Sequence, residues 1–466
     1  MPLAADTSGV AAPGVIVEAG VWAPDRRRLT LGLVLTITLV AFESLAISTV
    51  MPVVSDDLGG LSLYGWVFSA FFLGNLLGIV IAGQLADARG TALPFALGLA
   101  LFSAGLLVGG LAPSMGLLVV GRAAQGIGAG AIPAVAYASV GRAYPPALRP
   151  RVFAVFSSAW IIPGLIGPAA SSGIAEALGW RAVFLALLPF VVLAAVITLP
   201  ALSRAMPPVP AGTTPDADRR GHAVLLVAGV TVVLVALSGP PPGVAVGLAV
   251  VGLPLAARAF LRLVPAGTVR LAPGIPAAVM VRGILTFAFF GTDAYVSLTF
   301  QDVRDQPTWV AGVALTGATI LWTAAAWVQE RYVHRVGPRR LVTIGFACMA
   351  AGILGMFGAL GPLPITVAPL VWSIAGFGIG LSYSALSVIV LGLAEPGREG
   401  SASSSLQLSD VLGISLGTGL GGAFVALGES RDWPTRSALE LAFAVTLVVA
   451  LVGIAAARRL PTTLPA

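Results

Sequence analysis

Long apolar stretches, separated by short polar segments, repeat along the whole chain of 466 residues. Each stretch is long enough, as a helix, to cross about 30 Å of hydrocarbon. A membrane barrel would show short segments of alternating apolar and polar residues instead. The pattern predicts fourteen membrane helices, at residues 30–54, 64–86, 92–112, 115–140, 152–175, 181–202, 222–238, 243–261, 276–299, 308–329, 341–360, 365–393, 401–427 and 437–457.

The composition supports an integral membrane protein. Hydrophobic residues make up 57% of the chain and charged residues only 10%, whereas soluble domains carry about 25% charged residues. The net charge of +6 is spread over many loops, which argues against nucleic-acid binding because that function needs a gathered basic patch. The single cysteine, Cys348, excludes an intramolecular disulfide and a cysteine-based metal cluster.

All 26 basic side chains are arginines, and their positions test the number of helices. With the amino terminus in the cytoplasm, twenty arginines fall on the cytoplasmic side and four on the other side: Arg181, Arg304, Arg431 and Arg436. Cytoplasmic loops of membrane proteins carry such an excess. We therefore predict a multi-pass protein of the inner (plasma) membrane with both termini in the cytoplasm.

The fourteen spans fall into groups of six, two and six. Prolines and charges mark a cytoplasmic linker after the first group. The predicted units are a cytoplasmic tail (1–28), an N-terminal six-helix bundle (29–203), the linker (204–221), two additional helices (222–262) and a C-terminal six-helix bundle (263–460). The two additional helices lack acidic side chains, and we expect them to fill space beside the bundles or, in a lipid exporter, to shape a lateral groove.

Glu43 and Arg122 each lie inside a predicted span. A charge at the middle of a membrane helix costs roughly 2.5 to 3.5 kcal/mol. Glu43 lies about 16 Å, and Arg122 about 11 Å, from the outer end of its span, so the two depths are compatible with pairing. We hypothesise that Glu43 is the coupling carboxylate and that Arg122 modulates it, because breaking the pair changes proton binding. The alternative is a static pair that fixes helix register.

The second half contains a similar intramembrane acid, Asp293. Arg282 lies on nearly the same helix face but about 16 Å away, too distant to pair with it directly. Asp293 is therefore interpreted as a second titrating group, as an anchor for a cationic substrate, or as a structural group at the outer rim. Asp410 and Gln407 belong to a polar stripe that either lines a cavity or serves close helix packing.

A site for a lipophilic substrate needs apolar and aromatic walls with few polar groups. The candidate cavity residues are Asn75, Gln125, Phe287, Phe290, Trp322, Tyr383, Gln407 and Asp410. Each aromatic residue among them has an alternative interpretation as a lipid-facing or core side chain.

Five local motifs follow one another in the first part of the chain. They are Phe42-Glu43-Ser44 with Met51-Pro52, the segment 83–90, the segment 122–128, the segment 164–168, and Gly179-Trp180-Arg181 with Phe184. In this order they resemble the major facilitator superfamily, and in particular its fourteen-helix drug:proton antiporter branch. One departure is Glu43, where that branch usually has aspartate.

The resemblance implies an all-α polytopic fold of two six-helix bundles plus two linker helices, working by alternating access. It implies conformational gating by two groups of residues. They are Gly83, Asp87, Arg89 and Gly90 in a cytoplasmic loop, and Gly164, Gly167 and Pro168 in the fifth helix. The Gly167-Pro168 motif is similar to one associated with exporters.

The chain is therefore expected to export hydrophobic or amphipathic compounds in exchange for protons. It has no nucleotide-binding loop and no histidine or cysteine spacing suited to metal or nucleophilic chemistry, so we expect neither enzyme activity, nor a metal, nor a cofactor. The expected partners are a small-molecule substrate, protons and the lipid bilayer, with the chain as a monomer. The alternatives are an exporter of a specific lipid, siderophore or metabolite, an uptake symporter, and a receptor or scaffold without transport.

Overall fold

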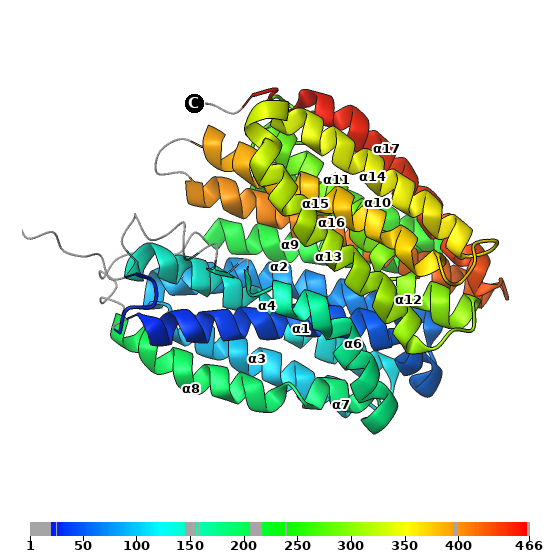
Figure 1. Ribbon diagram of the computed structural model, residues 1–466, viewed down its shortest axis with the longest axis horizontal. Coiled ribbons are helices and arrows are strands. Elements are labelled where there is room, and N and C mark those ends of the chain that lie inside the picture. The colour runs from blue at the N-terminus through cyan, green and yellow to red at the C-terminus, as the bar shows by residue number, and fades with distance from the viewer. Residues whose placement is uncertain are drawn as a thin grey trace, which may run out of the picture.

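The computed structural model describes residues 20–24, 26–144, 152, 155–156, 158–205, 217–237, 240–394 and 399–463. Regular structure in these residues is helical (Figure 1). Thirteen of the described helical segments are long and apolar enough to cross a membrane. They match the predicted spans except the fifth, 152–175, part of which lies outside the described residues and part of which forms α6 (Ile161–Leu178). The protein is a multi-pass, all-helical membrane protein.

The first set of helices precedes the proline-rich linker. It consists of α1 (Arg27–Leu58), η1 (Leu61–Leu63), α2 (Tyr64–Arg89), α3 (Ala92–Gly110), α4 (Met115–Ala143), α6 (Ile161–Leu178), α7 (Trp180–Leu185) and α8 (Leu188–Ala205). The helices α7 and α8 together form one span that is interrupted at Ala186 and Leu187. Pro189 explains the interruption, because it has no N–H to donate to the carbonyl four residues earlier.

The second set of helices forms the other half of the molecule. It consists of α11 (Ile275–Asp293), α12 (Val296–Leu298), η3 (Thr299–Val303), α13 (Thr308–Val336), α14 (Pro338–Ala359), α15 (Ala368–Leu393), α16 (Glu399–Ser430), α17 (Thr435–Ala456) and η4 (Ala457–Arg459). The first three elements form one long span with a break after Asp293.

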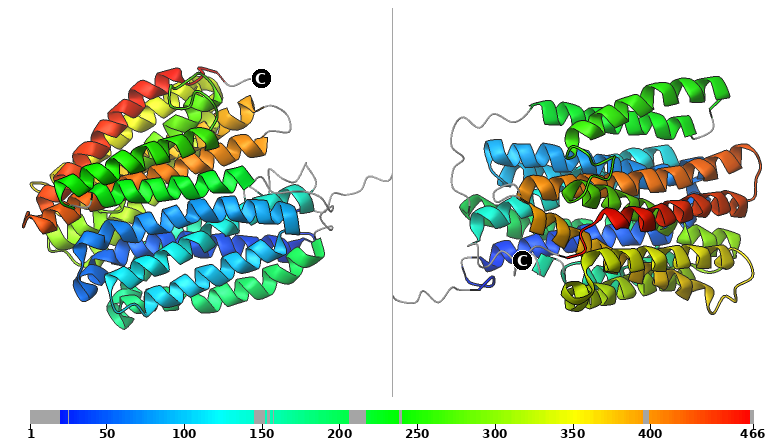
Figure 2. Two further views of the ribbon diagram at one scale, coloured as in Figure 1. Left: turned by 180° about the vertical axis from the view of Figure 1, so that it is seen from behind. Right: turned by 90° about the horizontal axis from the view of Figure 1, so that it is seen from above.

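The two sets lie side by side (Figures 1 and 2) and meet along two seams, α2 with α16 and α6 with α13. We call the end at which α1 begins the arginine-rich end, and the end that carries Arg181, Arg304, Arg431 and Arg436 the arginine-poor end. At the arginine-poor end, Ser69 Oγ donates to the carbonyl of Ser415 at 3.2 Å. A Cβ atom on Gly65 would lie 2.4 Å from the Cα of Gly422, so the backbones of α2 and α16 touch there.

The two additional helices, α9 (Ala217–Leu237) and α10 (Pro242–Leu263), form a hairpin along one side of the molecule (Figure 2, right). The helix α9 packs against both α2 and α16. Its buried stripe consists of Ala223, Leu226, Val230 and Leu234. The hairpin therefore lies over the seam between the two sets, a more specific position than the space-filling one that the sequence suggested.

Candidate functional site

Glu43 and Arg122 form a buried ion pair between α1 and α4. Nη1 of Arg122 donates to Oε1 of Glu43. The two side chains are 3% and 1% exposed. A buried pair persists only where attraction and hydrogen bonds offset the loss of hydration. The structure thus brings together the two charges that the sequence singled out.

Arg122 has further partners that hold it in place. Its Nε donates to the carbonyl of Val67 at 3.1 Å, and its Nη1 also donates to Oε1 of Gln125 at 2.8 Å. The guanidinium carbon lies 4.1 Å from the centroid of the Phe71 ring, close enough for a cation–π interaction. Arg122 therefore keeps acceptors and a ring surface that do not depend on Glu43.

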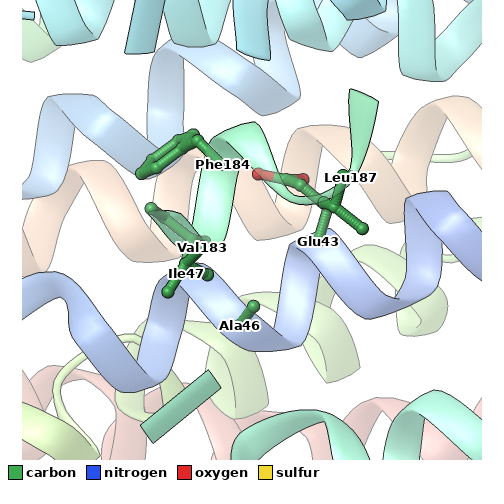
Figure 3. Close-up of a pocket in the computed structure, with 6 residues that line it drawn as sticks. All are labelled: Glu43, Ala46, Ile47, Val183, Phe184 and Leu187. Atoms are coloured by element: carbon green, nitrogen blue, oxygen red, sulfur yellow. The ribbon is translucent and has the colours of Figure 1, made fainter. Parts of the chain in front are cut away.

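The other carboxylate oxygen of Glu43, Oε2, accepts no hydrogen bond from the described residues. Among the described residues, Glu43 Oε2 and Gln125 Nε2 are buried without a hydrogen-bond partner. A small pocket beside Glu43 is lined by Ala46, Ile47, Val183, Phe184 and Leu187 (Figure 3). Leaving a buried acceptor unpaired costs about 1 to 3 kcal/mol, so each such group in a folded protein calls for an explanation.

Arg282 and Asp410 form a second buried ion pair, between α11 and α16. Nε of Arg282 lies 3.1 Å from Oδ1 of Asp410, and the Tyr383 hydroxyl donates to Oδ2 at 2.8 Å. The guanidinium carbon lies 3.0 Å from the centroid of the Tyr383 ring. Both carboxylate oxygens of Asp410 are therefore paired, which favours the helix-packing interpretation of this residue.

Asp293 lies at the carboxyl end of α11 and is 8% exposed. Its Oδ1 accepts a hydrogen bond of 2.7 Å from the indole N–H of Trp372, which is fully buried. The Phe289 ring stacks on Trp372 with centroids 5.0 Å apart. The structure thus places Asp293 against an aromatic partner from α15, and Arg282 pairs elsewhere, as the spacing of the two residues required.

Three of the predicted cavity residues join in one chain of aromatic rings. Phe290 and Trp322 have centroids 6.2 Å apart, and Trp322 and Tyr383 are 5.5 Å apart. Phe72 of α2 extends the chain across the two sets, with its centroid 6.4 Å from that of Phe290. All four rings are partly exposed. They form an aromatic wall where the two sets of helices meet.

The remaining predicted cavity residues, Asn75, Phe287 and Gln407, are partly buried. The backbone of Asn75 packs on Gly130, where an added Cβ would lie 2.0 Å from the Asn75 carbonyl oxygen. The backbone of Phe287 packs on Gly417 in the same way, at 2.4 Å. Asn75 and Phe287 therefore stand where helices of one set approach each other closely.

Residues 33–418 match the family model described as Major Facilitator Superfamily. The chain belongs to the major facilitator superfamily. The family predicted from the motifs is thereby confirmed.

Relatives within the superfamily carry names that refer to drug efflux. The chain is 26% identical over 433 residues to a probable multidrug-efflux transporter of Mycobacterium tuberculosis (strain ATCC 25618 / H37Rv), covering 88% of this chain and 90% of the relative. It is 26% identical over 414 residues to the multidrug transporter protein MdtP of Bacillus subtilis (strain 168), covering 85% of this chain and 75% of the relative.

Solved structures of other transporters show the same fold. The crystal structure of an auto-inhibited peptide transporter of the POT family matches with a TM-score of 0.69 at 16% identity, covering 94% of this chain and 99% of that one. A POT family transporter in complex with 5-aminolevulinic acid matches with a TM-score of 0.68 at 16% identity, covering 91% of this chain and 94% of that one. The predicted major facilitator fold is confirmed.

The superfamily loop at the end of α2 holds four predicted gating residues. Arg89 is exposed, and Gly90 closes the helix at a φ of +80°, a conformation that favours glycine. An added Cβ on Gly83 would meet no atom within 4 Å. The side chain of Asp87 lies outside the described residues. The gating role of this loop stays a prediction.

The predicted gating residues of α6 contact either α13, at the second seam between the two sets, or α1. A Cβ on Gly164 would lie 2.2 Å from Cγ2 of Thr319 in α13, so this glycine permits the close approach of the two sets. The Pro168 carbonyl accepts a hydrogen bond of 2.9 Å from Ser171 Oγ. Gly167 faces α1, where a Cβ would lie 3.7 Å from Phe42.

Sequence reasoning missed Arg282, Trp372 and Phe72 as residues of the site. Arg282 had the same signal as Arg122, a charge inside an apolar span, but Asp410 as its partner is 128 residues away. Trp372 and Phe72 carried no signal, because an aromatic residue in a membrane helix is equally compatible with lipid contact.

Proposed function

We propose that the protein is a proton-coupled exporter of hydrophobic or amphipathic compounds that works by alternating access. The observation that carries the proposal is the buried Glu43–Arg122 pair with an unpartnered carboxylate oxygen in the middle of the membrane. The arginine-rich end and both termini face the cytoplasm of the cell whose inner membrane holds the protein. No cofactor takes part, and the proton gradient supplies the energy.

The pair gives Glu43 two protonation states that depend on its surroundings. Beside the Arg122 guanidinium the ionised carboxyl is favoured, and away from it the apolar interior favours the neutral acid. A movement of α1 relative to α4 therefore binds or releases a proton. One charge crossing a membrane potential of about 150 mV supplies about 3.5 kcal/mol. That is enough for an uphill concentration ratio of a few hundred, since about 1.4 kcal/mol is tenfold.

The contacts between the two sets of helices at the arginine-poor end indicate which state of the transport cycle the structure represents. The pairs Ser69–Ser415 and Gly65–Gly422 join the sets at the arginine-poor end, and Gln301 Nε2 donates across them to the Thr49 carbonyl at 3.1 Å. In the proposed orientation this end faces outward. The state described here is closed to the outside, which is the state that takes up cargo from the cytoplasm.

The aromatic wall indicates the cargo. Phe72, Phe290, Trp322 and Tyr383 offer partly exposed rings from both sets. Aromatic faces bind apolar and aromatic compounds of varied shape, with few directional requirements. The relatives named for multidrug efflux support this assignment, and the superfamily is one of transporters rather than of enzymes.

Transport into inside-out membrane vesicles tests the function. An acid-inside pH gradient should drive accumulation of a fluorescent hydrophobic dye by the wild type, and a protonophore should abolish it. The Glu43→Gln variant should bind the dye but show no gradient-driven accumulation. An uptake symporter would expel the dye from these vesicles, and gradient-driven accumulation by a folded Glu43→Gln variant would refute the assignment of Glu43.

A further inference from the structure

The side chain of Leu234 fills the point at which three helices meet. It comes from α9 and is 2% exposed. A Cβ atom on Gly419 of α16 would lie 2.6 Å from Cδ2 of Leu234 and 2.8 Å from Oγ of Ser69 in α2. The same Ser69 hydroxyl group lies 3.3 Å from Oγ1 of Thr418 in α16. Leu234 therefore packs on the contact that joins the two sets of helices at the arginine-poor end.

A hydrogen bond from a charged donor joins α9 to α2 near the arginine-rich end. Nε of Arg220, close to the start of α9, donates to Oε1 of Gln84, close to the end of α2. Hydrogen bonds from a guanidinium are stronger and more directional than apolar contacts. The contact of Leu234 with Gly419 in α16, by comparison, is apolar packing. The helix α9 is therefore bonded to the first set and packed against the second.

The hairpin of α9 and α10 is closely packed within itself. A Cβ atom on Gly229 of α9 would lie 2.5 Å from the backbone nitrogen of Ala256 in α10. A Cβ atom on Gly252 of α10 would lie 3.0 Å from the Gly229 carbonyl oxygen. Small residues of this kind let the backbones of membrane helices approach each other. Two opposite views show α9 between α2 and α16 (Figure 1; Figure 2, left), so the hairpin is a compact unit that bridges the two sets.

Alternating access requires α2 and α16 to separate at the arginine-poor end when the protein opens outward. The helix α9 then stays with only one of them. We propose that the hairpin is a clamp on the outward-closed state: it moves with the first set, and Leu234 releases α16 each time this end opens. The inference rests on the alternating access of the proposed function.

The packing of Leu234 on α16 exists in the closed state alone, so its strength enters the equilibrium between the closed and open states. Membrane helices associate through close packing, because lipid tails are as apolar as the side chains themselves. Truncating a buried leucine leaves a cavity that the surrounding helices fill only in part. A smaller side chain at this position therefore weakens the closed state and leaves the open state unchanged.

The reaction rate of a buried cysteine measures how often the arginine-poor end opens. Ser297 of α12 is fully buried, and α12 packs against α1 of the other set. Ser297→Cys, in a Cys348→Ser background, is treated with a water-soluble maleimide in lipid nanodiscs without cargo or a gradient. Leu234→Ala should raise the reaction rate about tenfold, since part of the packing energy of a buried leucine is enough for that factor.

The matched control is Leu237→Ala, the same truncation on α9 at a side chain that is 43% exposed. It should leave the rate unchanged, and Leu234→Met, which conserves the side-chain volume, should stay close to the wild type. Leu234→Val removes less of the side chain, should give a smaller increase, and takes the place of Leu234→Ala if that variant does not fold. Equal rates in the truncated Leu234 variant and in Leu237→Ala would overturn the proposal.

Two cross-links, again in the Cys348→Ser background, determine which set the hairpin follows. A disulfide between Leu234→Cys and Gly419→Cys joins α9 to α16 and should stop dye accumulation in inside-out vesicles until it is reduced. A short bismaleimide between Gln84→Cys and Arg220→Cys joins α9 to α2 and should leave accumulation intact. Accumulation with α9 fixed to α16, or its loss with α9 fixed to α2, would contradict the clamp.

The labelling rates involve neither protons nor cargo, so the clamp and the proposed function fail separately. Equal labelling rates overturn the clamp, and transport by Glu43→Gln vesicles then still decides the proposed function. Vesicles of the wild type that accumulate no dye refute the proposed function, and the labelling rates of the Leu234 and Leu237 variants then still decide the clamp.

Discussion

Asp410 has a partner for each of its carboxylate oxygens, Arg282 and the Tyr383 hydroxyl, whereas Glu43 has a partner for only one. In the part of the chain that the structure describes, each set of helices thus contains a buried arginine–carboxylate pair with an aromatic ring against the guanidinium, Phe71 in one and Tyr383 in the other. The fully bonded pair resembles a structural cross-link between helices. The Glu43–Arg122 pair leaves one carboxylate oxygen without a partner, so it is the pair that we expect to rearrange during transport.

Removing one member of the Arg282–Asp410 pair should destabilise the protein strongly. Both side chains are buried, at 4% and 11% exposure. Breaking such a pair costs about 3 to 5 kcal/mol, because the remaining charge has no counterion. Arg282→Met and Asp410→Leu should each lower the unfolding temperature of the purified protein, and the double variant should recover much of it. Single variants as stable as the wild type would show that the pair is not buried in the folded protein.

Loss of the indole N–H at Trp372 should destabilise the protein through Asp293. Trp372→Phe keeps most of the ring but leaves a buried carboxylate oxygen without its donor, at a cost of about 1 to 3 kcal/mol. Asp293→Asn retains an acceptor oxygen and should be tolerated. A double-mutant cycle of Trp372→Phe with Asp293→Leu, which removes the acceptor, measures the coupling by thermal unfolding. Additive effects of the two changes would contradict the hydrogen bond.

Trp322 should contribute to cargo affinity, and Trp327 should not. Trp322 belongs to the aromatic wall, whereas Trp327 lies on the same helix, α13, and is 67% exposed on the outer surface. Trp322→Ala should weaken binding of an aromatic dye about two- to tenfold, since an aromatic contact contributes about 0.5 to 1.5 kcal/mol. Fluorescence titration of both variants is the measurement. Equal losses would place the cargo elsewhere.

A side chain at Gly65 should open the arginine-poor end. The Cβ of Gly65→Ala would overlap the Cα of Gly422, so α2 and α16 would have to separate. In a Cys348→Ser background, a cysteine at the buried position Ser69 should then react severalfold faster with a membrane-impermeant thiol reagent. Gly173→Ala is the control, because its Cβ meets no atom within 4 Å. An unchanged rate in Gly65→Ala would mean that this contact does not close the seam.

The helices and two of the key charges were predictable from local properties of the chain. An apolar run of membrane length forms a helix in lipid because no other local structure satisfies its backbone hydrogen bonds. Glu43 and Arg122 stood out because a charge inside such a run is costly and persists for a reason. Their depths followed from the rise per residue, and the structure pairs them.

Partners across helices depended on the packing of the complete molecule. The sequence allowed Arg282 to be compared only with Asp293 in its own helix, but its partner in the structure, Asp410, comes from α16. Asp293 instead accepts a hydrogen bond from Trp372 of α15. The side chains opposite Glu43 in its pocket, Val183, Phe184 and Leu187, come from α7 and the turn after it, about 140 residues further along the chain. Local sequence specifies which residues share a helix face, whereas rotation and approach of helices far apart in the chain select which faces meet. The helix contacts that form are those that minimise the free energy of the whole folded protein rather than that of any one segment.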